Sequence, residues 1–281
     1  MSDWIGSRCD LCEQVGQELY PADPARGLLR HARCAACGLV FVDPRPTDAA
    51  ARNEVLYGEP AAPGPGPGER ERDARHDARL RALRRRAGPQ ARVLDVGCGQ
   101  GAFLGRARRL GLLAEGLDLS PTRARAAAAR AEVPVHAGPL ESLPARPGFD
   151  LIRLHQVLEH TASPRALLAA ARARLAPGGE IELATPNAAA LAHRALGPAW
   201  RQLGRAHNGH LVLVDPRTLA RLAAAAGLRV LALRTRGARA WSLTRTGAAR
   251  RAWRLLELGL EPWVRLRGLG STLEARLTAS E

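Results

Sequence analysis

The chain has 281 residues, of which 46% are apolar, so it can form one full α/β domain and an appendage but not two large domains. Its net charge is +15 and all its 42 basic residues are arginine, scattered through nearly every expected helix, which favours a dispersed solvated charge over a nucleic-acid surface. No run of 18 apolar residues and no signal-peptide pattern occurs, so we expect a soluble cytoplasmic protein without a transmembrane segment.

Four cysteines near the N-terminus form two Cys-x-x-Cys pairs. Cys9 and Cys12 make the first pair, and Cys34 and Cys37 make the second. Four thiolates at this spacing suit a tetrahedral structural zinc ion (Zn²⁺). Two disulfides would be unusual in a cytoplasmic chain, and a thioredoxin-like redox site needs only one such pair. We therefore expect a zinc-ribbon-like head over residues 1–60 that depends on the metal for its folding.

The next segment separates this head from the rest of the chain. Residues 61–68 are rich in proline and glycine, which form neither a helix nor a sheet ladder, and they predict a linker. Residues 69–87 carry opposite charges four positions apart and a narrow apolar stripe. This pattern predicts a helix that lies on the main domain by one face.

A strand, a glycine turn and a helix are expected within residues 93–110. The turn carries Gly97, Gly99 and Gly101, and glycine suits a turn whose backbone approaches a ligand or takes positive φ angles. The helix that follows offers unpaired N–H groups at its start. Cys98, inside the turn, is interpreted as a small packed residue.

The strand expected at residues 113–118 ends in Asp118. In a doubly wound sheet, a carboxylate at this place lies beside the glycine turn and accepts both hydroxyls of a ribose. Asp95 puts a negative charge just before the turn, and the turn lacks the lysine of a phosphate-binding loop. Both features favour a cationic amino-acid ligand over a pyrophosphate.

The remaining chain alternates short apolar strands with alanine-rich helices, which indicates an α/β fold with helices on both faces of a parallel sheet. Further strands are expected at 133–137, 149–154, 179–185 and 228–235. Helices that begin at a proline are expected at 121–131, 164–175 and 216–226. Residues 237–267, with three tryptophans and many arginines, predict a helical insertion that forms a lid or a homodimer surface.

Taken together, these motifs resemble those of the class I S-adenosylmethionine (SAM)-dependent methyltransferases. Val93 to Gly101 is similar to the family's first motif and Gly116 to Ser120 to its second. Further similar stretches follow in the family's order at 138–144, 149–152, 155–160, 175–180 and 184–187.

The resemblance covers about residues 69–235 and implies a methyltransferase domain over residues 69–281. It also implies a Rossmann-like, seven-stranded, mostly parallel, doubly wound sheet whose last strand, within residues 268–279, is antiparallel. Residues 1–60 resemble the zinc-binding head of methyltransferases from bacterial sugar, polysaccharide and natural-product pathways.

The cofactor that the resemblance implies is SAM. The family's SAM-binding residues correspond in this sequence to Asp95, Gly97, Gly99, Gly101, Asp118, Leu140 and Glu141. In the family, the first motif faces the methionine portion and the acid of the second motif binds the ribose. Pro139 stands where the family places the acid that accepts the adenine amine, so backbone groups of Leu140 and Glu141 are expected to serve instead.

Acceptor chemistry in this family lies in the stretch that corresponds to His155–His160. Glu159 and His160 resemble the Glu-His pair of ubiquinone-type and small-RNA 2′-O-methyltransferases, in which an E-x-x-E-H motif and a distant histidine bind a divalent ion. Gln156 replaces the first glutamate here. His207 or His210 is the candidate for the distant histidine, and Trp200 is expected to be an apolar wall for the acceptor.

Three roles for these groups stay open. His155 or His160 acts as a general base, or Glu159, His160 and His210 hold a metal ion that acidifies an acceptor hydroxyl. Alternatively, Glu159 and His160 form a hydrogen-bonded pair that only shapes the loop.

We therefore expect methyl transfer from SAM to a small molecule, such as a sugar nucleotide, a polysaccharide precursor or a secondary metabolite. A non-catalytic scaffold that has kept the fold is the alternative that Pro139 favours. An RNA methyltransferase is the alternative that the arginines favour, although their scatter makes a nucleic-acid partner the weaker expectation.

Overall fold

The computed structural model describes residues 4–5, 8–46, 55–56, 69–144, 148–237 and 259–280. The chain forms two compact units, and neither unit is continuous in sequence. The first unit consists of Met1–Ala49, Gln156–Leu168 and Leu183–Ser280. The second consists mainly of Ala50–His155 and Ala169–Glu182.

Seven strands form one sheet in the order β12-β13-β10-β9-β6-β7-β8. Their bounds are Leu228–Arg236 (β12), Thr272–Ala279 (β13), Leu175–Pro186 (β10), Phe149–His155 (β9), Arg92–Val96 (β6), Leu113–Asp118 (β7) and Val135–Ala137 (β8). β6 pairs in parallel with β7 and β9, and β7 with β8, whereas β12 and β13 are antiparallel. The predicted α/β fold with a mostly parallel seven-stranded sheet is therefore confirmed.

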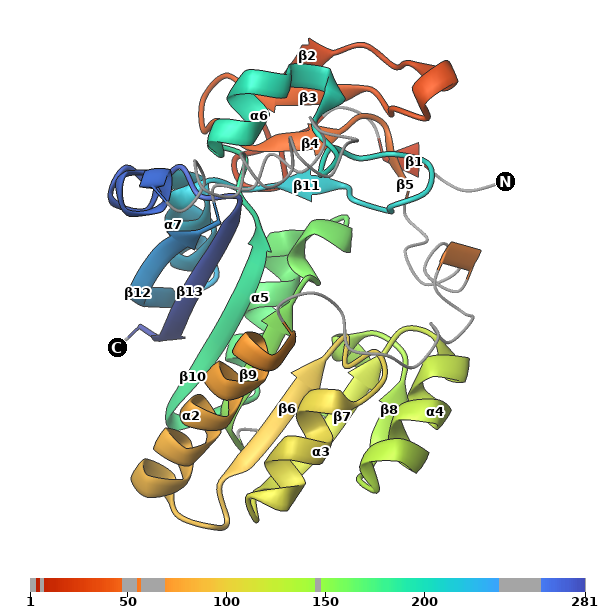
Figure 1. Cartoon of the computed structure of the whole chain (residues 1–281). Coiled ribbons are helices and arrows are strands. Elements are labelled where there is room, and N and C mark those ends of the chain that lie inside the picture. The colour runs from red at the N-terminus through yellow and green to blue at the C-terminus, as the bar shows by residue number, and fades with distance from the viewer. Residues whose placement is uncertain are drawn as a thin grey trace, which may run out of the picture. The chain divides into compact units, whose positions relative to one another are not determined.

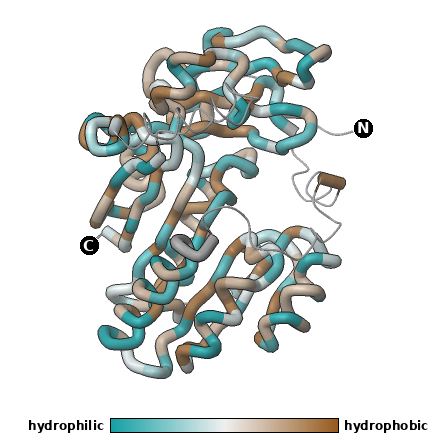
Figure 2. Tube along the Cα trace, viewed as in Figure 1, coloured by the Kyte–Doolittle hydropathy of each residue, from teal (hydrophilic) through white to brown (hydrophobic). Residues whose placement is uncertain are grey.

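The second unit contains the helices α2 (Glu69–Ala87), α3 (Ala102–Arg109) and α4 (Pro121–Ala131). Figure 1 shows α2 beside α3, with α2 against β9 and α3 against β6 and β7. The narrow apolar stripe of α2 is buried through Leu80 and Leu83, which join the core formed with Val93 and Leu104. In Figure 2, brown, hydrophobic residues lie along the strands, whereas teal, hydrophilic residues recur along α2. The helix therefore covers the sheet by one face, as its sequence predicts.

The first unit contains a small antiparallel sheet in the order β11-β4-β3-β2. Its strands are Val212–Leu213 (β11), Val40–Val42 (β4), His31–Cys34 (β3) and Gly16–Tyr20 (β2), and a separate pair is formed by Trp4–Ile5 (β1) and Arg45–Pro46 (β5). β11 comes from the C-terminal half of the chain and was not predicted. The head's sheet therefore includes a strand from outside residues 1–60, while the predicted linker at 61–68 lies outside the described residues.

The same unit also contains η1 (Pro24–Arg26), η3 (Leu158–His160), α6 (Leu191–Leu196), η4 (Gly197–Ala199) and α7 (Pro216–Ala225). α7 begins with a capping box, in which Asp215 and Thr218 each bond the backbone of the other. The Trp200 side chain is only 4% exposed and stacks on His193 with ring centroids 4.6 Å apart. The expectation that Trp200 forms an acceptor wall is therefore wrong, because its ring belongs to the core.

The largest differences from the expected bounds concern α5, β10 and β13. α5 (Pro164–Arg172) ends early because β10 already begins at Leu175, and β13 begins only at Thr272. Of the predicted insertion at 237–267, residues 238–258 lie outside the described residues and residues 259–266 are helical. Its role as a lid or dimer surface stays a prediction. None of the described helices is both long enough and apolar enough to span a membrane.

Candidate functional site

The glycine turn between β6 and α3 is tightly folded. Gly97, Gly99 and Gly101 have φ angles of 66°, 55° and 72°, which side chains disfavour. A Cβ atom added at Gly101 would lie 3.0 Å from the carbonyl oxygen of Ala127 on α4. At this position glycine is therefore needed both for the backbone angle and for the close approach of α4.

Asp118, at the end of β7, joins this turn directly. Its carboxylate accepts hydrogen bonds from the backbone N–H of Gly99 at 2.9 Å and of Ser120 at 3.0 Å. Burial raises the pKa of Asp118, although these two donors lower it in part. A carboxylate has about four acceptor positions, so this geometry leaves two for the hydroxyls of a ribose.

Asp95, at the other side of the turn, is fully buried. One carboxylate oxygen, Oδ1, accepts a hydrogen bond at 2.8 Å from Arg153 of β9. The other, Oδ2, has no partner among the described residues. A buried carboxylate oxygen without a donor is costly, and it suits an ammonium group of a ligand.

His155 lies beside this pair, at the end of β9. The second terminal nitrogen of Arg153 donates to His155 Nδ1 at 2.9 Å, and His155 Nε2 lies 3.1 Å from Glu182. Because an arginine only donates, Nδ1 accepts and Nε2 carries the proton that is given to Glu182. Burial lowers the pKa of His155, and the Arg153 charge lowers it further. Both ring nitrogens are thus engaged, which favours a positioning role over that of a general base.

Glu182 of β10 extends the same network to α2. Its other carboxylate oxygen accepts from Arg79 Nε at 2.9 Å. Burial raises the pKa of Glu182, but the His155 hydrogen bond and the Arg79 charge outweigh burial and lower this pKa to about 2. His76 of α2 meets the His155 ring edge-on at 5.6 Å. The sheet and the covering helix therefore share one polar network.

The loop that should meet the adenine follows β8. Leu140 is buried and Glu141 is exposed in the short helix η2 (Leu140–Ser142). Arg174 is only 3% exposed and donates to the carbonyl oxygens of Glu141, at 3.4 Å, and Leu143. The Arg174 guanidinium therefore holds the backbone of this loop in place. Backbone groups of the same loop are the ones expected to bind adenine.

In the first unit, Glu159 lies in η3 and is 1% exposed. Thr185 donates to its Oε2 at 2.9 Å, whereas Oε1 has no partner among the described residues. Burial raises the pKa of Glu159 to about 7. A carboxyl group that is held at one oxygen and open at the other is suited to bind a cation.

Two histidines complete this group. His160 Nδ1 bonds the Gly209 carbonyl at 3.2 Å, and His210 Nδ1 bonds the Gln202 carbonyl at 2.8 Å. In each neutral ring, the lone pair then lies on Nε2, as in metal-bound histidines that donate their other N–H to a carbonyl. One ligand atom from each of Glu159, His160 and His210 lies within 4.8 Å of the others. Their donor set fits a divalent transition metal.

Neither of the other residues considered for this group belongs to it. His207 is exposed and is not part of the cluster, so the structure brings only His210 to Glu159 and His160. Gln156 is exposed, has a φ of 56° and donates from its amide to the Ala184 carbonyl at 3.3 Å.

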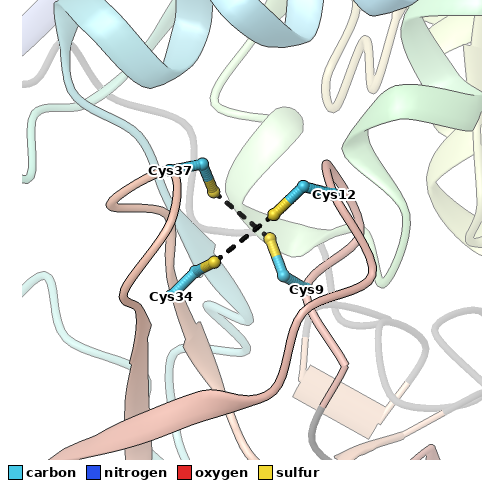
Figure 3. A group of neighbouring side chains, drawn as sticks. All are labelled: Cys9, Cys12, Cys34 and Cys37. Atoms are coloured by element: carbon cyan, nitrogen blue, oxygen red, sulfur yellow. Dashed lines mark hydrogen bonds between the residues drawn. The ribbon is translucent and has the colours of Figure 1, made fainter.

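The four N-terminal cysteines converge from two loops, as Figure 3 shows. The Sγ atoms of Cys9 and Cys37, and those of Cys12 and Cys34, are each 3.4 Å apart. These distances exceed the roughly 2.05 Å of a disulfide bond and approach the edge of a tetrahedron with Zn–S bonds of about 2.3 Å. Burial raises the pKa of Cys34, but the Cys37 N–H and the Cys12 thiol outweigh burial and lower it to about 7. The cluster therefore fits a structural zinc ion.

Asp10, inside the first cysteine pair, reaches the start of α5. It accepts from Ser163 Oγ at 2.6 Å and from the Arg165 N–H at 2.9 Å. The carboxylate therefore caps the helix that directly follows Glu159 and His160. The loop between Cys9 and Cys12 is thereby joined to the start of α5.

Several polar residues of these networks were not predicted from the sequence. Arg153, Glu182 and Arg174 sit in or beside apolar strands, where an isolated charge is itself an indication of a buried partner. Thr185 and Asp10 carry no such indication, because each is a common residue whose partner is distant in sequence.

Comparison with known proteins identifies the family. The family model described as "Methyltransferase domain" matches residues 69–233. The ubiquinone biosynthesis O-methyltransferase of Xanthomonas euvesicatoria pv. vesicatoria is 33% identical over 151 residues, covering 50% of this chain and 63% of that protein. Its counterpart in Xanthomonas campestris pv. campestris is 37% identical over 106 residues, covering 35% of this chain and 44% of that protein. The match thus covers less than two thirds of the length of either relative.

Solved structures share the fold at low sequence identity. The N-methyltransferase NodS of Bradyrhizobium japonicum, in complex with S-adenosylhomocysteine (SAH), gives a TM-score of 0.52 at 18% identity, over 82% of this chain and 99% of that chain. A putative sarcosine dimethylglycine methyltransferase of Galdieria sulphuraria gives 0.54 at 16% identity, over 83% and 98%. The [4+2]-cyclase SpnF gives 0.50 at 18% identity, over 83% and 93%. These likenesses concern the fold alone.

Proposed function

Because the chain belongs to the methyltransferase domain family, we propose that it transfers the methyl group of SAM to a hydroxyl group of a small molecule. The observation that carries the hydroxyl assignment is the cluster of Glu159, His160 and His210, whose donor atoms suit a divalent ion. The two Xanthomonas relatives, both ubiquinone biosynthesis O-methyltransferases, support the same acceptor type.

The donor would bind along the carboxyl ends of β6 and β7. Asp118 would accept the ribose hydroxyls, and the unpartnered Oδ2 of Asp95 would accept the methionine ammonium group. Backbone groups of Leu140 and Glu141, in the loop that Arg174 fixes, would meet the adenine. SAM supplies an activated methyl group on a sulfonium, so the protein has mainly to align donor and acceptor.

On the acceptor side, we favour a metal site over a general base. Glu159 would offer its open oxygen, and His160 and His210 would each offer Nε2, because their Nδ1 atoms are bonded to backbone carbonyls. A divalent ion held by these residues would lower the pKa of an acceptor hydroxyl group. The alternative mechanism has His160 alone as the general base, and it needs no metal ion.

We also propose that Cys9, Cys12, Cys34 and Cys37 hold one structural zinc ion. The support is the four converging sulfur atoms, which leave no open position for chemistry. The acceptor itself is proposed as a sugar nucleotide, a polysaccharide precursor or a secondary metabolite. This choice is supported by the resemblance of the cysteine-rich head to those of such enzymes.

The first test is a calorimetric titration of the purified protein with SAH. We expect micromolar binding that Asp118→Asn weakens strongly, because the amide cannot accept through both atoms. Glu132→Gln, which changes an exposed carboxylate of the same unit, should leave binding unchanged. If the folded, zinc-loaded protein binds no SAH, the methyltransferase proposal fails and a scaffold that has kept the fold takes its place.

The acceptor side needs a separate test. Metal content measured by mass spectrometry should fall from two ions per chain to one in Glu159→Gln, while the cysteine-bound zinc stays. Methylation of catechol-type and sugar-nucleotide acceptors should then fall with the second ion. Full activity in a variant that has lost this ion would instead favour His160 as a general base.

A further inference from the structure

Arg153 ties the buried carboxylate beside the glycine turn to a second carboxylate near α2. One terminal nitrogen of its guanidinium bonds Asp95 at 2.8 Å and the other bonds His155 at 2.9 Å. His155 in turn bonds Glu182 at 3.1 Å. The planar fork of an arginine can bridge two acceptors in this way, whereas a lysine offers one compact charge.

Two further contacts fix the side chain of Arg153. Its guanidinium carbon lies 4.5 Å from the centre of the Phe103 ring of α3. Asp95 and Arg153 are partners in the β6–β9 register, so both backbones fix the distance between the two side chains. The guanidinium is therefore oriented by an aromatic face, a strand pair and a histidine.

The consequence for Asp95 concerns its two oxygens. Oδ1 is occupied by Arg153, and Oδ2 is buried without a partner among the described residues. The Arg153 guanidinium supplies the compensating charge and the hydrogen bond that a buried carboxylate needs. It occupies Oδ1 and so leaves Oδ2 as the one oxygen that can accept from a ligand.

We propose that Arg153 is a positioning residue for the amino-acid end of the donor. It holds Asp95 so that Oδ2 alone accepts from the donor's ammonium group, and it is itself oriented by His155 and Glu182. This inference rests on the proposed binding of SAM. It goes beyond that proposal because it assigns recognition of the amino-acid end to the network of Arg153, His155 and Glu182, which connects β9 with β10.

A pair of ligands separates this role from a general effect on folding. SAH carries the amino-acid end, whereas 5′-methylthioadenosine has the same adenosine and lacks the ammonium and carboxylate groups. A residue that only supports the fold should affect both ligands. A residue that positions Asp95 should affect SAH alone.

The variant is Arg153→Lys, which keeps the charge and loses the bridge. Calorimetry should give an SAH affinity about tenfold weaker, as expected for a displaced hydrogen bond to a charged group. The affinity for 5′-methylthioadenosine should stay within about twofold of that of the unchanged protein, because ribose and adenine contacts are untouched.

Arg92→Lys is the matched control. Arg92 lies at the opposite end of β6, bonds the Glu115 carboxylate at 2.7 Å and covers the Phe149 ring at 4.7 Å, so it repeats the surroundings of Arg153 away from the turn. This variant should bind both ligands like the unchanged protein. If Arg153→Lys does not fold, Glu182→Gln tests the far end of the network and should weaken SAH binding alone, by a smaller factor.

The outcomes separate the positioning role of Arg153 from the proposed binding of SAM. Equal losses for the two ligands, or an unchanged SAH affinity in both network variants, would overturn the positioning role. Binding of neither ligand by the unchanged protein would instead remove the proposed function itself.

Discussion

At the scale of single residues, two buried carboxyl groups show how the same chemistry takes different roles. Asp95 meets a cation inside the protein, while Glu159 meets one hydroxyl group and keeps an open oxygen. Burial raises the pKa of Glu159 to about 7, so without a metal ion it is largely neutral below that pH. A cation would have to displace this proton, so its binding should strengthen as the pH rises.

The pKa of Glu159 predicts how stability depends on pH when the acceptor-side ion is absent. Because the folded pKa lies above that of the unfolded chain, the stabilising effect of the neutral carboxyl group is complete below about pH 4.5 and is lost as the pH rises through about 7. Glu159→Gln should therefore be more stable than the unchanged protein at pH 8, by on the order of 3 kcal/mol, and about equally stable at pH 4.5.

Urea unfolding of both proteins at equal zinc content checks this expectation. A stability difference that does not change between pH 4.5 and pH 8 would mean that Glu159 is ionised in the folded protein.

At the scale of elements, the loop between Cys9 and Cys12 is joined to the segment around Ser163. Asp10 lies between two zinc-ligand candidates and caps α5, which begins just after His160. This contact is formed by a carboxylate that is more than 150 positions from its partners along the chain.

Removal of this cap should loosen the loop without removing the metal. Asp10→Ala should cost about 1 kcal/mol, as for other lost helix caps, and should speed amide hydrogen exchange over residues 157–163. Zinc content should stay at one ion per chain at the cysteines. Asp215→Ala removes the cap of α7 and should cost about as much without changing exchange at 157–163, since α7 has its own capping box.

The elements also show what the sequence can and cannot predict. Helix α2 and the strand ending at Asp118 were predicted with their bounds, because apolar periodicity and turn residues are local signals. β11 was missed, because a strand of two residues has no periodicity and exists only through its pairing with β4. Trp200 was misjudged for a related reason, since burial depends on partners such as His193 that only the fold brings near.

The candidate site follows the same division. The glycine turn and Asp118 were predicted because one short stretch of chain contains their pattern, and the structure brings Asp118 to the turn as expected. The Arg153 network was not predicted, since it requires the register of β6 with β9 and the position of Glu182 on β10. Whether these residues bind SAM stays a prediction.

At the scale of the whole molecule, the two units carry different halves of the proposed chemistry. The donor residues, from Asp95 to Glu141, belong to the second unit, whereas Glu159, His160 and His210 belong to the first, together with the cysteines. Backbone bonds in the first unit run from Val42 to Leu211 and from Leu211 to Glu159, at 2.8 and 2.6 Å. The head is thereby connected to the acceptor residues.

Loss of the zinc ion that we propose at the cysteines should therefore affect the two halves unequally. Cys34→Ser should release the ion, loosen the first unit and abolish methylation, because the connection to Glu159 is lost. SAH affinity should stay within about threefold, since the cysteines and the proposed donor residues belong to different compact units. Calorimetry beside an activity assay checks this, and a collapse of SAH affinity would contradict the independence of the donor half.

The pairing of β11 with β4 also determines which segments must be transferred together when the head is grafted onto another protein. A gene segment for residues 1–60 would carry the cysteines but not the edge strand that closes β4. Grafting of the head onto a relative would then require a second, distant segment around residues 205–213, with its bridge from Arg205 to Leu28. Recombination that moves residues 1–60 alone should therefore leave β4 without its partner strand β11.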